Sequence, residues 1–319
     1  MTRTAFDNVP MASGPEFDAI RAMLAEWGDL ARGIGDDAAT LEIPRGDLLV
    51  VSTDASVEDV HFRRAWMSAA EIGARAASAA LSDLAAMAAA PHGLLLALGV
   101  PYSWTAELPE LARGVGDAAR RAGCPIVGGN VTRARELSLT ITVLGHTASP
   151  LRRSGAQVGD VVAVTGRLGG PRAALEALEA GRVPEPAHLE RFVGPVPRID
   201  EARWLAEHGA HAAIDVSDGL LADAAHVARA SSVSLAIDLE RVPCVEGVRP
   251  EVAAASGEEY ELLVALRGDA AELSRHFAER FQLPLTAIGV VEPAGGEPVI
   301  VRNSRGARVD PARGHDHFS

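Results

Sequence analysis

Apolar and polar positions along the first half of the chain follow two alternating patterns. Three short aliphatic runs have the composition of buried strands: residues 48–52 (LLVVS), 93–100 and 138–145. Two longer, alanine-rich segments have the three-to-four residue period of a helix with one buried face: residues 69–90 and 106–122. This order of strands and helices predicts an α/β or α+β fold.

A turn-rich, charged stretch at residues 147–160 (TASPLRRSGAQVGD) interrupts this pattern and suits a link between domains. Since 319 residues are enough for two domains, we expect one over residues 1–149 and another over residues 150–319. The second domain has further strand and helix patterns: strands at 161–165, 212–215, 234–237, 261–266 and 286–291, and helices at 172–180 and 220–230. The proline-rich residues 183–197 predict a connection.

The amino-acid composition excludes several classes of protein and of catalytic site. The formal net charge is −13, which argues against a nucleic-acid surface, and no apolar run approaches the roughly 20 residues of a bilayer span. Without a visible secretory signal, we expect a cytoplasmic protein. All 30 basic residues are arginine, so a Walker A loop and Schiff-base chemistry are excluded. Cys124 and Cys244 lack metal-ligand spacing and predict small buried hydrophobes.

Several short acidic clusters lie at the ends of apolar runs. In Gly33-Ile-Gly-Asp-Asp37, glycines let the backbone turn two carboxylates toward one point, although a solvated turn has the same sequence. Ser52-Thr-Asp54 follows the aliphatic run, so its oxygens are expected where a strand ends. Such oxygen ligands suit Mg²⁺.

Asp83 lies eleven residues after Ile72, which is about 20° away in helical angle. It therefore shares an apolar face, where a carboxylate needs a partner or a metal to offset desolvation. The alternative is that Ser82 starts a new helix and Asp83 lies in its first turn.

The sharpest cluster is residues 213–220 (AIDVSDGL). A strand delivers Asp215, Ser217 is expected to cap the next helix, and Asp218 with Gly219 forms a tight turn. Two carboxylates and a hydroxyl within four residues form half of a metal–phosphate site.

Three further segments carry weaker signals. Residues 256–260 (SGEEY) place carboxylates before a strand, and residues 128–133 (GGNVTR) follow a strand end and offer phosphate contacts. The glycine-rich turn at residues 166–171 is either an anion cradle or an ordinary strand-to-helix turn.

Taken in order, these motifs resemble the thiamine-monophosphate kinase family, within the larger group that includes aminoimidazole ribonucleotide synthetase. The match runs from Gly33 to Phe318, and it includes GIGDDAA, STD followed by HF, LSDLAAM, GGNVTR, RSGA with GD, AIDVSDGL, GEEYEL and GHDHF. The resemblance implies a two-domain fold whose N-terminal domain forms an intersubunit β-barrel in a homodimer, beside a C-terminal α/β domain. It implies direct in-line transfer of the γ-phosphate of ATP to thiamine monophosphate, with several Mg²⁺ ions.

The resemblance also implies roles for individual residues. Those expected to bind Mg²⁺ are Asp37, Ser52, Thr53, Asp54, Asp83, Asn130, Asp215 and Asp218. Those expected to meet ATP are Gly129, Asn130, Arg153 and Ser217. Those expected to hold thiamine monophosphate are His61, Glu258 and His315.

Four positions depart from the family pattern. Asn130 stands where an aspartate usually binds metal, Asp59 and Ser256 replace glycines, and His315 replaces an aromatic residue. Two other functions therefore stay open: an enzyme of the same larger group with another small acceptor, and a nucleotide-binding protein without turnover.

Overall fold

The computed structural model describes residues 14–34, 38–268, 270–303 and 305–308 of the chain. They divide into two compact units. Unit 1 comprises the chain up to Leu84 together with Ala89–Ala148, and unit 2 comprises Ala85–Ala88 and the chain from Ser149 onward. Within the described ranges, no helix has both the length and the apolar character needed to cross a bilayer.

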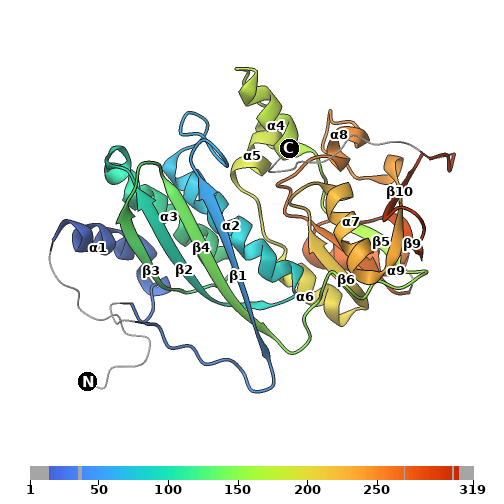
Figure 1. The fold of residues 1–319 in the computed structure, drawn as a ribbon, viewed down its shortest axis with the longest axis horizontal. Helices are drawn as coiled ribbons and strands as arrows, with labels where there is room; N and C mark the ends of the chain where they lie inside the picture. The colour runs from blue at the N-terminus through green and yellow to red at the C-terminus, as the bar shows by residue number, and fades with distance from the viewer. Residues whose placement is uncertain (1–13, 35–37, 269, 304, 309–319) are drawn as a thin grey trace. The chain divides into compact units, whose positions relative to one another are not determined.

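Unit 1 is built on a four-stranded sheet of order β1-β4-β2-β3, and Figure 1 shows helices α2 and α3 on one face of it. Its elements are α1 (Pro15–Trp27), η1 (Gly28–Leu30), β1 (Leu48–Val57), α2 (Ala69–Ala86), β2 (Ala90–Val100), η2 (Tyr102–Glu107), α3 (Leu108–Arg121), β3 (Ile126–Arg133) and β4 (Ser138–Thr147). Strand β2 is parallel to β3 and antiparallel to β4, which in turn is antiparallel to β1.

Helix α2 starts at a capping box, in which Glu71 Oε2 accepts the Ser68 N–H and Ser68 Oγ accepts the Glu71 N–H. Its small residues let it approach α3 at backbone distance. A Cβ atom added at Gly114 would lie 1.9 Å from the Ala70 carbonyl oxygen, and one added at Gly73 would lie 2.2 Å from the Leu111 carbonyl oxygen. Glycine is therefore required at both positions for this packing.

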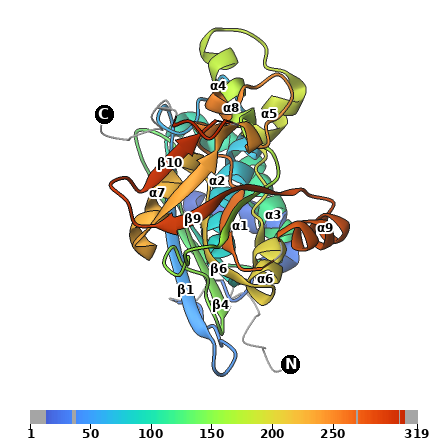
Figure 2. The ribbon, with the colours of Figure 1, turned by 90° about the vertical axis from the view of Figure 1, so that its right-hand side faces the viewer.

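Unit 2 contains a mixed six-stranded sheet of order β10-β7-β9-β5-β8-β6. Its elements are β5 (Val161–Thr165), α4 (Gly170–Glu179), α5 (Pro186–Val193), α6 (Ile199–Glu207), β6 (Ala210–Asp215), α7 (Leu220–Ser231), β7 (Val233–Asp238), η3 (Leu239–Arg241), α8 (Pro250–Ala254), β8 (Leu262–Leu266), α9 (Ala270–Phe281), β9 (Leu285–Pro293) and β10 (Val299–Arg302). Helices α6 and α9 lie side by side (Figure 2), with the rings of Trp204 and Phe277 5.8 Å apart.

The predicted strands are all present, and most are longer than their aliphatic runs. Two predictions were wrong in part. Residues 183–197 are not only a connection, because α5 begins inside them with Pro186 in its first turn, where proline costs no hydrogen bond. The helix expected over residues 69–90 ends at Ala86, and β2 has begun by Ala90, since alanine composition alone does not mark a helix end.

Candidate active site

In unit 1, the structure joins two of the predicted metal ligands. The Ser52 hydroxyl donates to the Asp83 carboxylate, across 31 positions of sequence. Helix α2 runs unbroken through Ser82, so Asp83 lies in its last turn, and the alternative of a new helix starting at Ser82 is wrong. The carboxylate on the apolar face is therefore paired, as its desolvation requires.

The expectation that Ser52-Thr-Asp54 emerges at a strand end was wrong, because β1 continues to Val57. Side chains alternate along a strand, so the three residues do not share a face. Ser52 and Asp54 pair with Val143 and Ile141, whose side chains are buried. Thr53 points to the opposite face, where its Oγ1 lies 3.0 Å from Thr142 Oγ1.

Gly129 and Asn130 lie within β3 rather than after a strand end. At Gly129 the backbone φ is 157°, and an added Cβ atom would lie 2.0 Å from the Leu96 carbonyl oxygen, so only glycine fits there. Asn130 is exposed on this edge strand, whereas Asp54 lies on the other edge. Three strand spacings separate them, or about 14 Å. One metal ion therefore cannot bind both side chains within a single sheet.

His61 lies in the turn after β1. Its Nδ1 accepts the Val57 N–H at 3.2 Å, and Arg75 Nη1 donates to the His61 carbonyl oxygen at 2.8 Å. Because Nδ1 is an acceptor, the proton of the neutral ring is on Nε2. His61 thus presents a hydrogen-bond donor, which suits a phosphate oxygen.

In unit 2, strand β6 ends at Asp215, which is 5% exposed, and the chain then turns through Ser217 and Asp218 into α7. The expectation that Ser217 caps this helix was wrong. The residue before the helix is Gly219, and no side chain caps the helix from that position. Gly219 has φ 119°, which explains the glycine.

Asp223, in the first turns of α7, stabilises this turn instead. Its Oδ2 accepts the N–H groups of Ser217, Asp218 and Gly219 at 3.0, 3.1 and 3.1 Å. Burial, together with the nearby charges of Asp218 and Asp215, raises the pKa of Asp223 to about 7. One ligand atom from each of Asp218, Asp223 and His226 lies within 4.8 Å of the others. Two carboxylates and an imidazole at this spacing offer oxygen and nitrogen ligands that could hold a divalent cation.

The second acidic motif packs directly against this turn. The Glu258 N–H donates to the Ser217 carbonyl oxygen at 2.7 Å, and the Val216 N–H donates to the Glu261 carbonyl oxygen at 2.7 Å. Glu258 and Tyr260 have φ values of 58° and 53°, which non-glycine residues rarely adopt. Such strain in two neighbouring residues is typical of functional sites.

The glycine-rich turn before α4 is already occupied. The Gly169 N–H donates to Glu259 Oε1 at 2.6 Å, and the Arg172 N–H donates to Ser256 Oγ at 3.3 Å. The acceptor at this turn is therefore the chain's own Glu259 side chain, and an ordinary strand-to-helix turn is the better description.

The remaining predicted residues are less constrained. Arg153 is exposed, and its backbone is fixed by Ser231, whose hydroxyl donates to the Arg153 carbonyl oxygen at 3.0 Å. Asp37 and His315 lie outside the described residues. Cys124 is fully buried, as expected of a small hydrophobe, whereas Cys244 is only partly buried.

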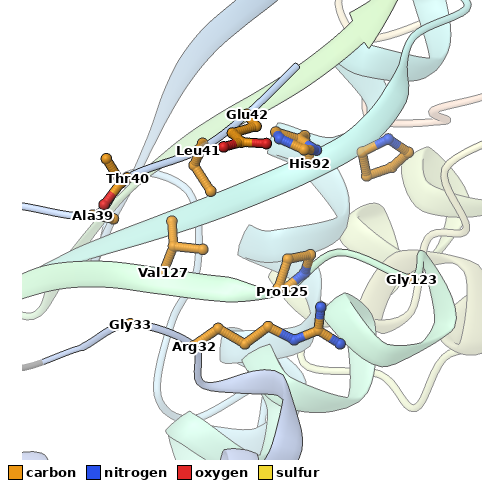
Figure 3. A pocket seen from close by; sticks show the side chains of 11 residues that line it. Arg32, Gly33, Ala39, Thr40, Leu41, Glu42, His92, Gly123, Pro125 and Val127 are labelled. Atoms are coloured by element: carbon orange, nitrogen blue, oxygen red, sulfur yellow. The ribbon is translucent and has the colours of Figure 1, made fainter. Parts of the chain in front are cut away.

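Unit 1 also has a pocket of about 270 Å³ beside the first residues of β2 and β3. Figure 3 shows Arg32 on one side and Glu42 with His92 on the other, with apolar residues such as Leu41 and Val127 between them. Among the residues that the structure describes, no predicted ligand lines this pocket, although Gly33 of the first acidic motif does.

Comparison with known proteins identifies the family. The sequence models of the AIR synthase related protein, N-terminal domain, and of its C-terminal domain match residues 35–147 and 157–302. The thiamine-monophosphate kinase of Bacillus subtilis is 32% identical, over 95% of this chain and 99% of its own. The chain belongs to the thiamine-monophosphate kinase family.

Solved structures of thiamine-monophosphate kinases have the same fold. The enzyme from Stenotrophomonas maltophilia matches with a TM-score of 0.80 and 33% identity, over 93% of this chain and 98% of that chain. The complex of AaThiL with AMPPCP and TMP matches with a TM-score of 0.75 and 32% identity, over 95% of this chain and 96% of that chain.

Two departures from the usual thiamine-monophosphate kinase motifs have local explanations. Asp59 has φ 64°, a conformation natural for the glycine it replaces and tolerated by aspartate. Ser256 is fully buried, and its hydroxyl accepts the Arg172 N–H in the first turn of α4. The serine thus adds a hydrogen bond that glycine cannot make.

Sequence reasoning assigned no individual role to Asp223, Glu259 or Glu261, although the last two lie in a motif that it noted for its carboxylates. Glu261 is 1% exposed, and Arg198 donates to its two oxygens at 2.8 and 2.6 Å. For Asp223 and Glu261, the available signal was an acidic residue in a mainly apolar stretch. The partner of Glu261 was not predictable, because Arg198 lies 63 positions away.

Proposed function

We propose that this protein transfers the γ-phosphate of ATP to the phosphate of thiamine monophosphate, giving thiamine diphosphate and ADP. The observation that carries the proposal is the likeness, over 95% of this chain, to the AaThiL complex with AMPPCP and TMP. AMPPCP is an analogue of ATP, so that complex combines the phosphate donor with the phosphate acceptor. The acceptor phosphate is already an oxyanion at neutral pH, so direct in-line attack needs little general-base help.

The residues present fit Mg²⁺ by their chemistry, because they offer carboxylate, hydroxyl and amide oxygens. The predicted ligands are Ser52, Thr53, Asp54, Asp83 and Asn130 in unit 1 and Asp215 and Asp218 in unit 2, and Asp37 belongs to the same motif set. Mg²⁺ held by these residues would neutralise negative charge on the phosphates and so favour the approach of the two substrates.

Other residues would bind the two substrates directly. His61 Nε2 can donate to the acceptor phosphate, since its Nδ1 is occupied by the Val57 N–H. The Glu258 carboxylate suits the cationic ring or the amino group of thiamine, and His315 is its expected companion. Gly129, Arg153 and Ser217 would contact ATP. The chain has no lysine, so an arginine must supply any protein cation at the phosphates.

We further propose a homodimer in which the N-terminal sheets of two copies close into one barrel. Leu48, Leu49 and Val51 on the edge strand β1 are about half exposed, at 51%, 49% and 55%. An apolar sheet edge of this kind is available for pairing with another chain. Within one copy, Asn130 lies about 14 Å from the strand that carries Thr53 and Asp54. If β3 of a second copy lay beside β1, the Asn130 of that copy would approach these two residues.

A coupled ADP-release assay with thiamine monophosphate and Mg²⁺ tests the function. Robust turnover is expected. Turnover only with another small acceptor would instead indicate a related enzyme of the larger group. ATP binding without turnover would indicate a nucleotide-binding protein.

A further inference from the structure

We propose that Asp223 is a positioning residue, which holds the turn carrying Asp215, Ser217 and Asp218 in the geometry that binds metal and nucleotide. This inference rests on the proposed function of those three residues. Asp223 itself need not touch either substrate for it to act.

Hydrogen bonds hold the turn from both sides. On one side, a single oxygen of Asp223 accepts three consecutive backbone N–H groups, from Ser217 to Gly219. On the other side, the Glu258 N–H donates to the Ser217 carbonyl oxygen, and the Glu259 and Tyr260 N–H groups donate to the Val216 carbonyl oxygen. These backbone groups are therefore engaged within the protein, and we expect a ligand to be bound by side chains of the turn.

Three converging N–H groups form an anion-binding concavity of the kind that often cradles phosphate. Here the anion is internal, because Asp223 is 1% exposed and occupies all three donors. The backbone of the turn is thus unavailable to ATP phosphates, and the contact expected from Ser217 must come from its hydroxyl. Without Asp223, the three donors would be released and the turn could rearrange.

The local placement of Asp223 supports this role. It lies four residues after Gly219, whose carbonyl oxygen accepts the Asp223 N–H at 2.9 Å. The helix therefore presents the carboxylate back toward its own N-terminus, where negative charge is favoured. Gly219 has no side chain with which to cap α7, and Asp223 supplies side-chain hydrogen bonds that join the turn to the helix.

The test compares Asp223→Ala and Asp223→Asn with Asp160→Asn in the full chain. Asp160 is a matched control, since it is 5% exposed, lies in unit 2 and accepts the Gln157 N–H at 2.8 Å. ADP release is measured against Mg²⁺ concentration at saturating substrates, and thermal midpoints are recorded for each protein. We expect Asp223→Ala to raise the half-saturating Mg²⁺ concentration on the order of tenfold, the usual effect of losing an outer support of a metal ligand.

The asparagine variant should show a smaller rise, because its amide oxygen can still accept N–H bonds without the charge. Asp160→Asn should lower the thermal midpoint but keep the Mg²⁺ requirement within about twofold, well below the outer-support effect. An unchanged Mg²⁺ profile in folded Asp223→Ala, or an equal rise in Asp160→Asn, would overturn the proposal. If the alanine variant does not fold, Asp223→Asn decides.

Hydrogen exchange separates this proposal from the proposed function. In the wild-type protein, the amides of residues 217–219 should exchange slowly, and in Asp223→Asn they should exchange at least several-fold faster. This outcome is expected even if thiamine monophosphate is not the acceptor. Identical exchange in both proteins would overturn the positioning role, whatever the assay shows.

Discussion

Two buried glutamates, Glu259 and Glu261, lie two positions apart in one segment but have different electrostatic surroundings. Glu261 is paired with Arg198 by two hydrogen bonds and also accepts from the Thr165 hydroxyl at 2.7 Å. Glu259 accepts the Gly169 N–H at 2.6 Å, and its burial raises its pKa to about 8. Burying a carboxylate without a paired cation disfavours its charge.

Glu259→Gln should therefore change how stability depends on pH. The Glu259 pKa is raised from 4.5 to about 8, so the folded state binds more protons than the unfolded state between these values. The contribution of Glu259 to the stability of the wild-type protein then falls as pH rises from about 5 to about 8. The glutamine variant should lose at least about 1 kcal/mol less over this range, the value of one pKa unit.

Urea unfolding at several pH values between 5 and 8.5 measures this difference. Glu279→Gln, on the exposed surface of α9, serves as the matched control and should follow the wild type. Parallel pH curves for wild type and Glu259→Gln would contradict the prediction.

Asn130→Asp should restore a ligand charge at a position where the family usually has aspartate. Because a carboxylate neutralises Mg²⁺ and an amide does not, the half-saturating Mg²⁺ concentration should fall by roughly tenfold, as for about 1.4 kcal/mol of added attraction. ADP release over a Mg²⁺ titration measures it. No change would remove Asn130 from the metal ligands.

At the scale of elements, close backbone contact fixes the pairing of α2 and α3. Gly73 and Gly114 each face a carbonyl oxygen of the opposite helix, at distances that leave no room for a methyl group. Side-chain volume, rather than hydrophobicity, thus sets how near the two helices lie. Asp83 extends from α2, so its distance to Ser52 depends on this packing.

Gly114→Ala should separate the two helices and destabilise the protein by about 3 kcal/mol, at the upper end for an overpacked site. Gly296→Ala is the control, because an added Cβ atom there meets nothing within 4 Å. Thermal unfolding should show a clear decrease for the first variant and almost none for the second. Equal midpoints would mean that the helix contact is looser than described.

At the scale of the whole molecule, the open apolar edge of β1 predicts association of two copies. Val51→Lys places a charge in that edge, and burying the charge in a dimer would cost more than the contact contributes. We expect a shift from dimer to monomer, measured by light scattering after size-exclusion chromatography.

Val183→Lys is the control for that experiment. Val183 is 93% exposed but lies in unit 2, outside any strand, so its substitution should leave the dimer intact. A monomeric wild-type protein, or a dimer unaffected by Val51→Lys, would contradict the predicted interface.

The sequence by itself determined the features that depend on neighbouring residues. Aliphatic runs marked the strands and short acidic motifs indicated the family, because each run or motif spans only a few consecutive positions. The absence of lysine removed whole classes of phosphate-binding site. The sequence determined less well where an element ends and which face of a sheet a side chain is on. Strand β1 continues where it was expected to end, so Thr53 points to the face opposite Ser52.

Only the tertiary structure decided which distant residues meet. Ser52 in β1 donates to Asp83 in α2, 31 positions later, and the turn after Asp215 is closed by the segment around Glu258, some 40 positions later. Asp223, inside α7, accepts the N–H groups of the turn that precedes the helix, whereas the sequence predicted that Ser217 would cap the helix. These pairings depend on packing between elements, and local periodicity carries no information about which elements will pack.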